Sequence, residues 1–265
     1  MSWIPAAEPV AEAPNAMRDF YITLPSNTRG KDAANTTADF RVLLPNEIQL
    51  NGDWEVGIVE VIYPNSWFNV NDEPSAGGFV SKSNEIVMIR APKQGYRITI
   101  PANHYSSIGQ LLGAIKRAQT TTKADPFEFS LDENSGRVKY DAPNVATVVV
   151  LPPLLQYMLG FEAYGVRKGT VARYPPDLRG GIDALFVYSD IVEPQIVGDT
   201  KAPILRIIPV SGSFTDIVDR VFVAPHYVPV LNKQFSSVRI TIKTDQDRLV
   251  PFQFGKVIVK LHNFH

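Results

Sequence analysis

Two stretches decide the fold: residues 54–63 read WEVGIVEVIY and residues 237–243 read SVRITIK. Both are rich in β-branched and aromatic side chains, a composition typical of strands. In the second stretch Val238, Ile240 and Ile242 alternate with polar residues. This period of two predicts a strand with one face toward a core and the other toward water.

Six further stretches have the same composition and end at proline or turn-forming residues. Together they predict an all-β protein, and eight strands suggest a single jelly-roll β-sandwich of two four-stranded sheets. A turn at 244–247 joins the last two strands, and Trp54 is expected to point toward the core. The predicted strands span residues 19–24, 39–44, 54–63, 184–189, 204–210, 220–223, 237–243 and 256–261.

A different pattern occupies residues 84–181, between the two groups of strands. Ser107 and Gln110 form a capping box, and apolar residues at helical spacing follow, so we expect a helix over 105–119. A second, short helix is expected over 153–159, because proline precedes it and glycine follows it. Short strands and hairpins fill the rest, at 84–90, 96–100, 127–131, 137–141 and 145–151. The sequence therefore predicts a small α+β segment inserted into a sandwich made of 18–83 and 182–265.

The first 17 residues form a separate region. They contain mainly alanine, proline and acidic residues, a composition that cannot bury enough apolar surface to fold by itself. We expect a flexible N-terminal arm over 1–17. Trp3 and Ile4, near its tip, are candidates for contact with a neighbouring subunit.

Composition excludes several classes of protein. The 26 Lys and Arg residues against 27 Asp and Glu give a net charge of 26 − 27 = −1, and the basic residues are scattered, so direct sequence-specific binding of nucleic acid is not expected. The absence of cysteine excludes disulfides and thiolate metal sites. The longest apolar run, residues 145–155, is too short for a membrane span. Residues 1–14 do not resemble a secretory signal, so the protein is expected to remain and assemble inside the cell, in nucleus or cytoplasm.

No constellation of catalytic residues is present. The four histidines, His104, His226, His262 and His265, lack the spacing of a metal site. Phosphate-binding loops and nucleophile elbows are also missing. The sequence predicts neither an enzyme nor a bound cofactor or metal.

Long stretches of the chain resemble one known family. The resemblance lies in residues 20–27 (FYITLPSN), 40–69 (FRVLLPNEIQLNGDWEVGIVEVIYPNSWFN) and 188–210 (YSDIVEPQIVGDTKAPILRIIPV), with shorter similar segments at 105–107, 152–161, 225–229 and 251–257. The chain is similar to the minor capsid, or penton, protein of Maverick/Polinton virus-like transposons and related viruses.

That resemblance implies a structural virion protein. Its subunits are expected to form homopentamers at the five-fold vertices of an icosahedral capsid, beside a separate double jelly-roll major capsid protein. Aromatic residues and prolines in loops are then candidates for assembly contacts. We assign this role to Trp67, Phe68, Tyr174, Pro175 and Pro176.

The resemblance also draws attention to Leu178, Arg179, Gly180 and Gly181. This motif is similar to sites cut by the adenovirus-like maturation proteases that accompany the family. A plain glycine-rich loop explains the same four residues. Mature particles that contain only full-length chain would exclude the cleavage.

A second function stays open at this point. A jelly roll with an insertion also suits a carbohydrate-binding or receptor-binding module of a virion, in which the inserted segment contacts a host receptor or glycan. Sharp sugar specificity on a glycan array would favour that alternative.

Overall fold

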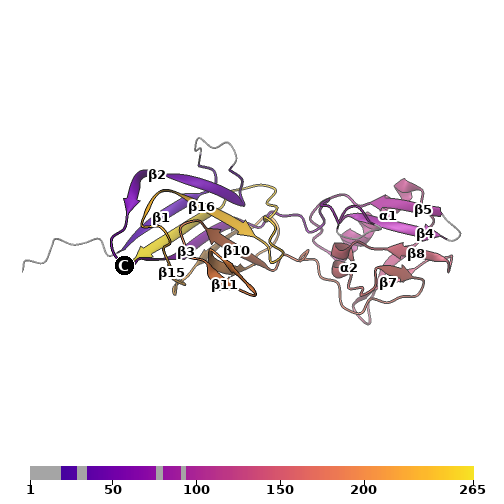
Figure 1. Ribbon diagram of the computed structural model, residues 1–265. Helices are drawn as coiled ribbons and strands as arrows, with labels where there is room; N and C mark the ends of the chain where they lie inside the picture. Colours follow the sequence, from indigo (N-terminus) through magenta and orange to yellow (C-terminus); the bar gives the residue numbers. More distant parts are fainter. Residues whose placement is uncertain (1–18, 29–34, 76–79, 91–93) are drawn as a thin grey trace, which may run out of the picture.

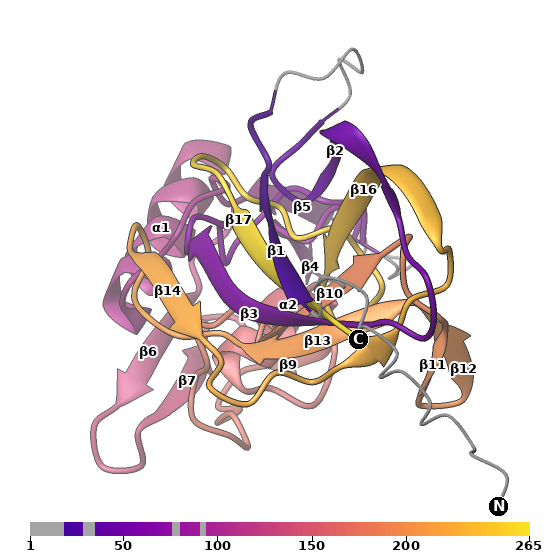
Figure 2. The ribbon, with the colours of Figure 1, turned by 90° about the vertical axis from the view of Figure 1, so that its left-hand side faces the viewer.

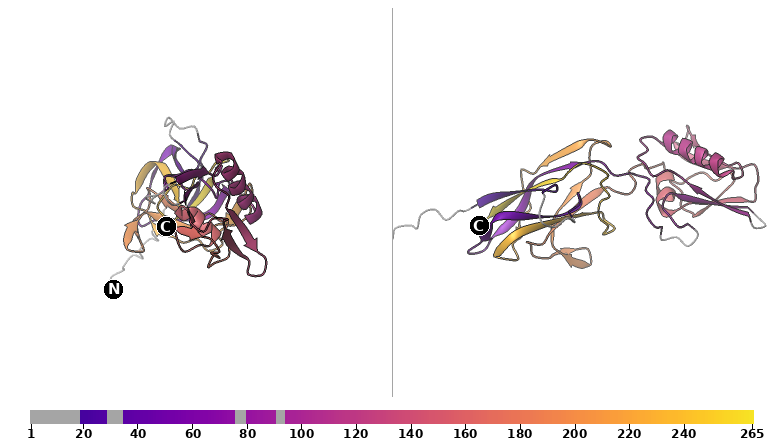
Figure 3. Two further views of the ribbon diagram at one scale, coloured as in Figure 1. Left: turned by 90° about the vertical axis from the view of Figure 1, so that its right-hand side faces the viewer. Right: turned by 90° about the horizontal axis from the view of Figure 1, so that it is seen from above.

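The computed structural model describes residues 19–28, 35–75, 80–90 and 94–265. These residues form two units placed end to end and joined by a narrow connection (Figures 1 and 3). The predicted arm, with Trp3 and Ile4, lies outside the described residues.

The first unit is a sandwich of two antiparallel sheets. Figure 2 views it from the end where the C-terminus lies, with the second unit behind it. The first sheet contains, in spatial order, β1 (Asp19–Pro25), β17 (Ile258–Phe264), β3 (Glu55–Pro64) and β14 (Ile217–Val221), with the short β15 (Val228–Pro229) also paired to β3. The second sheet contains β13 (Ile204–Pro209), β10 (Ala184–Ser189), β16 (Gln234–Lys243) and β2 (Asp39–Gln49).

This strand order confirms the jelly roll. All eight predicted strands are present, four in each sheet, and most connections cross from one sheet to the other. First and last strands lie side by side, with Ile22 opposite Leu261. A small hairpin of β11 (Gln195–Val197) and β12 (Thr200–Ala202), which the sequence pattern did not predict, extends from the sandwich.

The period-two pattern correctly predicted the buried faces. Val238, Ile240 and Ile242 are at most 1% exposed and lie in the core between the sheets. Trp54 packs against the same core and remains partly exposed. Apolar alternation therefore fixed which face of each strand points inward.

One expected connection is different in the structure. The turn after β16 forms, since the Asp247 N–H donates to the Thr244 carbonyl at 3.2 Å. However, β16 and β17 do not pair: they belong to different sheets, and residues 244–257 connect them. The turn residues fixed a local bend but carried no information about which sheet the next strand joins.

The second unit is an α+β structure with its own core. Its sheet has the order β5 (Gln94–Thr99), β4 (Glu85–Arg90), β8 (Thr147–Val150) and β9 (Gly165–Arg167), beside a hairpin of β6 (Glu128–Asp132) and β7 (Arg137–Asp141). The helices described in this unit are α1 (Ile108–Thr122) and α2 (Pro153–Leu159). The predicted cap is present at α1: the Ser107 hydroxyl accepts from the Gln110 N–H at 3.2 Å, whereas the Gln110 side chain accepts at 3.0 Å from the N–H of Ser106, one residue before the N-cap.

The second unit begins earlier than the sequence indicated. Val70 is fully buried in its core and forms a bridge with Asn103, so the predicted boundary between residues 83 and 84 is too late. Among the described residues just after Val70, 71–75 and 80–83 contain isolated bridges in place of a long strand, so the sequence showed no periodic signal for this part of the second unit. The chain crosses between the units at residues 64–70 and 178–183, which we call the waist.

Candidate functional site

Exposed apolar side chains gather at one edge of the sandwich. Strand β14 forms the end of its sheet, and Ile217 and Val221 on it are 76% and 66% exposed. Val223, just beyond the strand, is 98% exposed. Edge strands that carry exposed β-branched residues are sites of association unless something covers them. This edge is therefore a candidate assembly surface.

The same sheet presents an aromatic cluster at its other edge. The Tyr21 ring stacks on His262 at 4.5 Å. The His262 ring lies between the Tyr227 hydroxyl, 2.6 Å from Nδ1, and the Asp19 carboxylate, 3.1 Å from Nε2. Asp19 begins β1, so this cluster lies where the predicted arm would join the sandwich.

The outer face of the opposite sheet is charged and ion-paired. Arg239 forms a bidentate pair with Asp39 at 2.8 and 2.6 Å, and hydrogen bonding to this guanidinium lowers the pKa of the Asp39 carboxyl. Arg41 lies 3.0 Å from Asp190 on the same face. Paired charges of this kind are typical of a solvated surface.

Two of the predicted contact residues have internal roles instead. Trp67 is 3% exposed and packs edge-on against Phe252 at 5.8 Å in the sandwich core, so its assignment as an assembly contact is wrong. Phe68 is half-buried and lies 6.3 Å from Phe214, which also stacks on His104 at 4.1 Å. The rings of Phe68, Phe214 and His104 thus connect the two units. An aromatic residue that follows a strand can pack at an internal junction as readily as at an external interface.

The loop at 174–176 lies on the surface of the second unit. Tyr174 is 53% exposed, with the Arg173 guanidinium 5.6 Å from its ring centre. Pro175 is exposed and Pro176 is half-buried. The loop remains a candidate contact.

Residues 178–181 form one of the two chain crossings at the waist. Arg179 pairs with Asp177 and with Asp183. The Leu178 carbonyl accepts a hydrogen bond of 2.7 Å from the Asn69 amide, and Gly180, with φ of +68°, lies so close to Asn69 that a Cβ would come within 2.9 Å of its Cα. Asn69, on the other crossing, therefore contacts the motif at both Leu178 and Gly180.

Chemistry-bearing residues do not converge in the described part of the chain. No group of three or more His, Cys, Asp or Glu side chains there is arranged to hold a metal ion. None of the described helices is long and apolar enough to cross a membrane. The candidate functional features of this structure are therefore its surfaces.

The sequence pattern missed the apolar edge of β14. The stretch DIVDRVFV at residues 216–223 has the composition of a buried strand, and composition gives no indication that this strand ends a sheet. Only the strand order reveals the exposure of Ile217 and Val221.

The described residues define a single jelly roll with an α+β unit inserted between its third and fourth strands. No family model matches the sequence, and no curated protein matches it. Two solved structures have a similar fold. The crystal structure of the mavirus penton protein aligns with a TM-score of 0.52 and 9% identity over 93% of this chain and 98% of that one. A chain in the Sputnik virophage structure aligns with a TM-score of 0.50 and 10% identity, with the same coverage.

Proposed function

We propose that this protein is the minor capsid (penton) subunit of a virus or virus-like transposon, and that five copies form a ring at each five-fold vertex of an icosahedral shell. The observation that carries the proposal is the extent of the structural likeness. It spans both units and the connection between them, and it covers nearly the whole of the mavirus penton protein.

The surfaces of the sandwich support a ring. A closed ring needs two different surfaces on each subunit, one for each neighbour. The two edges of the first sheet differ: β14 presents Ile217 and Val221, whereas β1 presents Tyr21 and Asp19. Burying side chains that are two-thirds exposed would stabilise association by roughly 1–2 kcal/mol each.

The same proposal includes the partners and the place of the protein. Its neighbours in the shell would be copies of itself and a double jelly-roll major capsid protein. It would reside in the virion, after assembly in the nucleus or cytoplasm of the host cell. The arm at 1–17 and the loop at 174–176 are the proposed additional contacts.

The solution mass by light scattering coupled to size exclusion tests this function. We expect a mass near five times the 29.4 kDa subunit. Deletion of residues 1–17 and the substitution Ile217→Asp should each reduce the mass toward one subunit. A natural chain that stays monomeric at high concentration would contradict the proposal.

A further inference from the structure

A cavity of about 850 Å³ lies between the two units at the waist. Its wall comes from segments far apart in sequence: residues 71–75 with Ser83, the first part of α2, the crossing at 180–183 and residues 244–251 after β16. Pockets that bind ligands commonly measure about 300–1,000 Å³ and occur at junctions between domains. Neither the proposed ring nor the fold assigns this cavity a role.

Polar side chains on the wall have unused hydrogen-bonding capacity. Within the described ranges, Glu73, Asp245, Gln246 and Arg248 line the cavity, and their side chains make no hydrogen bond or ion pair. Unpaired polar groups that converge on a cavity are the feature expected of a recognition site.

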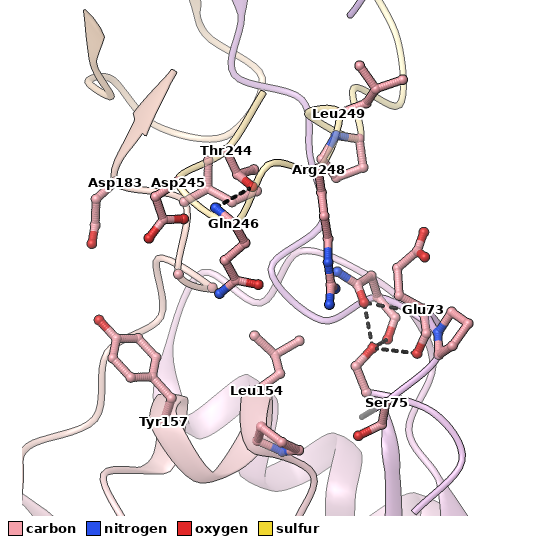
Figure 4. A pocket seen from close by; sticks show the side chains of 18 residues that line it. Glu73, Ser75, Leu154, Tyr157, Asp183, Thr244, Asp245, Gln246, Arg248 and Leu249 are labelled. Atoms are coloured by element: carbon pink, nitrogen blue, oxygen red, sulfur yellow. Dashed lines mark hydrogen bonds between the residues drawn. The ribbon is translucent and has the colours of Figure 1, made fainter. Parts of the chain in front are cut away.

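The charges are not distributed evenly. Figure 4 shows Asp183, Asp245 and Gln246 on one side of the cavity, with Arg248 and Glu73 on the other. Asp183 already pairs with Arg179 at 3.0 Å, so Asp245 is the carboxylate that a ligand would find unpaired on the first side. That side complements a cation, whereas Arg248 can donate to a carbonyl or carboxylate.

Apolar surface lies between the polar sides. Leu154 occupies the floor in Figure 4, while Leu249 and Tyr157 are 45% and 49% exposed at the margin. An extended peptide offers a basic side chain, backbone carbonyls and an apolar side chain within a few residues. A neutral sugar lacks the cation, and a nucleic acid would bring phosphates against Asp245.

We propose that the waist cavity binds an extended peptide segment of a partner protein. A Lys or Arg side chain of that segment pairs with Asp245 and Gln246, its backbone carbonyls accept from Arg248, and an apolar side chain packs on Leu154. The inference goes beyond the penton role and does not depend on it, because every wall residue comes from one subunit.

Fluorescence anisotropy of the full chain with labelled hexapeptides tests this site. The probes place leucine and arginine two residues apart in a glycine-serine background, and matched probes replace the arginine with glutamine or glutamate. We expect the arginine peptide to bind about three- to fivefold more tightly than the glutamine peptide, since an ion pair with an exposed carboxylate contributes at most about that factor.

Three variants, all at exposed positions, make the test specific. Asp245→Asn should abolish the preference for arginine, and Arg248→Gln should weaken all peptides about equally. Asp199→Asn, on the turn between β11 and β12, is the matched control and should bind as the natural chain does. Absence of binding at millimolar peptide, or a preference that survives Asp245→Asn, would overturn the proposal. Binding only to neutral oligosaccharides on a parallel glycan array would also overturn it. The light-scattering mass of the natural chain is independent of these outcomes, so the two proposals can fail separately.

Discussion

The sandwich and the second unit build their cores from chain segments of very different sequence separation. In the sandwich, β1 pairs with β17, so Ile22 at one end of the chain lies opposite Leu261 at the other. Within the described chain, the buried core of the second unit consists of residues between Val70 and Ala172, and Leu178 packs against it. The second unit is thus one continuous stretch of chain, with a helix that packs on its sheet, whereas the sandwich is assembled from the segments before and after it.

This difference has consequences for folding. Contacts between distant segments form slowly because the chain must close a long loop first. The second unit can form from local contacts, whereas the sandwich needs β17, which pairs with β1 and β3 over about 200 residues of sequence or more. No buried residue belongs to both clusters, and so the units should behave as separate thermodynamic domains.

Matched core substitutions should show the difference between the two units with the largest effect. Leu111 in α1 and Leu261 in β17 are both fully buried, one in each core. Each Leu→Ala change should cost about 3–5 kcal/mol through lost burial and the cavity left behind. In calorimetry, Leu111→Ala should lower only the transition of the second unit, and Leu261→Ala only that of the sandwich. A single transition that shifts equally in both variants would show that the units unfold as one.

Asn69 at the waist should have the next largest effect. Its side chain is 2% exposed, donates to the carbonyls of Tyr105 and Leu178 at 3.0 and 2.7 Å, and accepts from the Tyr105 N–H at 2.8 Å. Asn69→Ala leaves these groups unpaired and should cost about 2–3 kcal/mol in denaturant unfolding. It should also expose residues 178–181 to proteolysis. Asn134→Ala, at an exposed position in the turn between β6 and β7, is the control, and equal protease resistance of both variants would argue against a clamped waist.

The junction should also respond to pH. His104 lies half-buried against Phe214, and burial lowers the pKa of its ring below the usual 6.5. The unfolded chain therefore binds more protons just below pH 6.5, so the free energy of unfolding falls as the pH drops through that value.

The test is thermal unfolding at about pH 7.5 and about pH 5.5. The midpoint should fall further for the natural chain than for His104→Gln, whereas His226→Gln, at an exposed histidine, should follow the natural chain. An identical pH response in all three proteins would contradict this account of the junction.

The charged outer face of the second sheet should show the smallest effect. Arg239 and Asp39 are partly exposed, and surface pairs contribute about 0.2–1 kcal/mol. Arg239→Ala should therefore change stability by less than about 1 kcal/mol and leave the solution mass unchanged. Loss of the oligomer in this variant would show that the assembly surface lies on the second sheet and not on the first.

The sequence predicted the fold more completely than it predicted the functional surfaces. Alternation in stretches such as 237–243 is a local signal of burial, and it identified all eight sandwich strands and both helices. The strands that it missed, β9, β11, β12 and β15, are two or three residues long, too short to show a period. The sheet to which β17 belongs depends on pairing with β1 and β3, which no local pattern records.

The candidate surfaces depend on neighbours, and for that reason the sequence located them poorly. Trp67 and Tyr174 have similar contexts beside prolines and aromatics, yet one is buried and the other is 53% exposed. The waist cavity needs the turn after β16 to lie opposite α2, an arrangement that two distant segments make only in the folded chain.

Electron cryomicroscopy of the purified protein would show whether the subunits form the proposed ring. The account predicts rings with five-fold symmetry, in which the sandwiches form the ring and the second units project from one side. Rings of another symmetry, or single subunits at all concentrations, would contradict it.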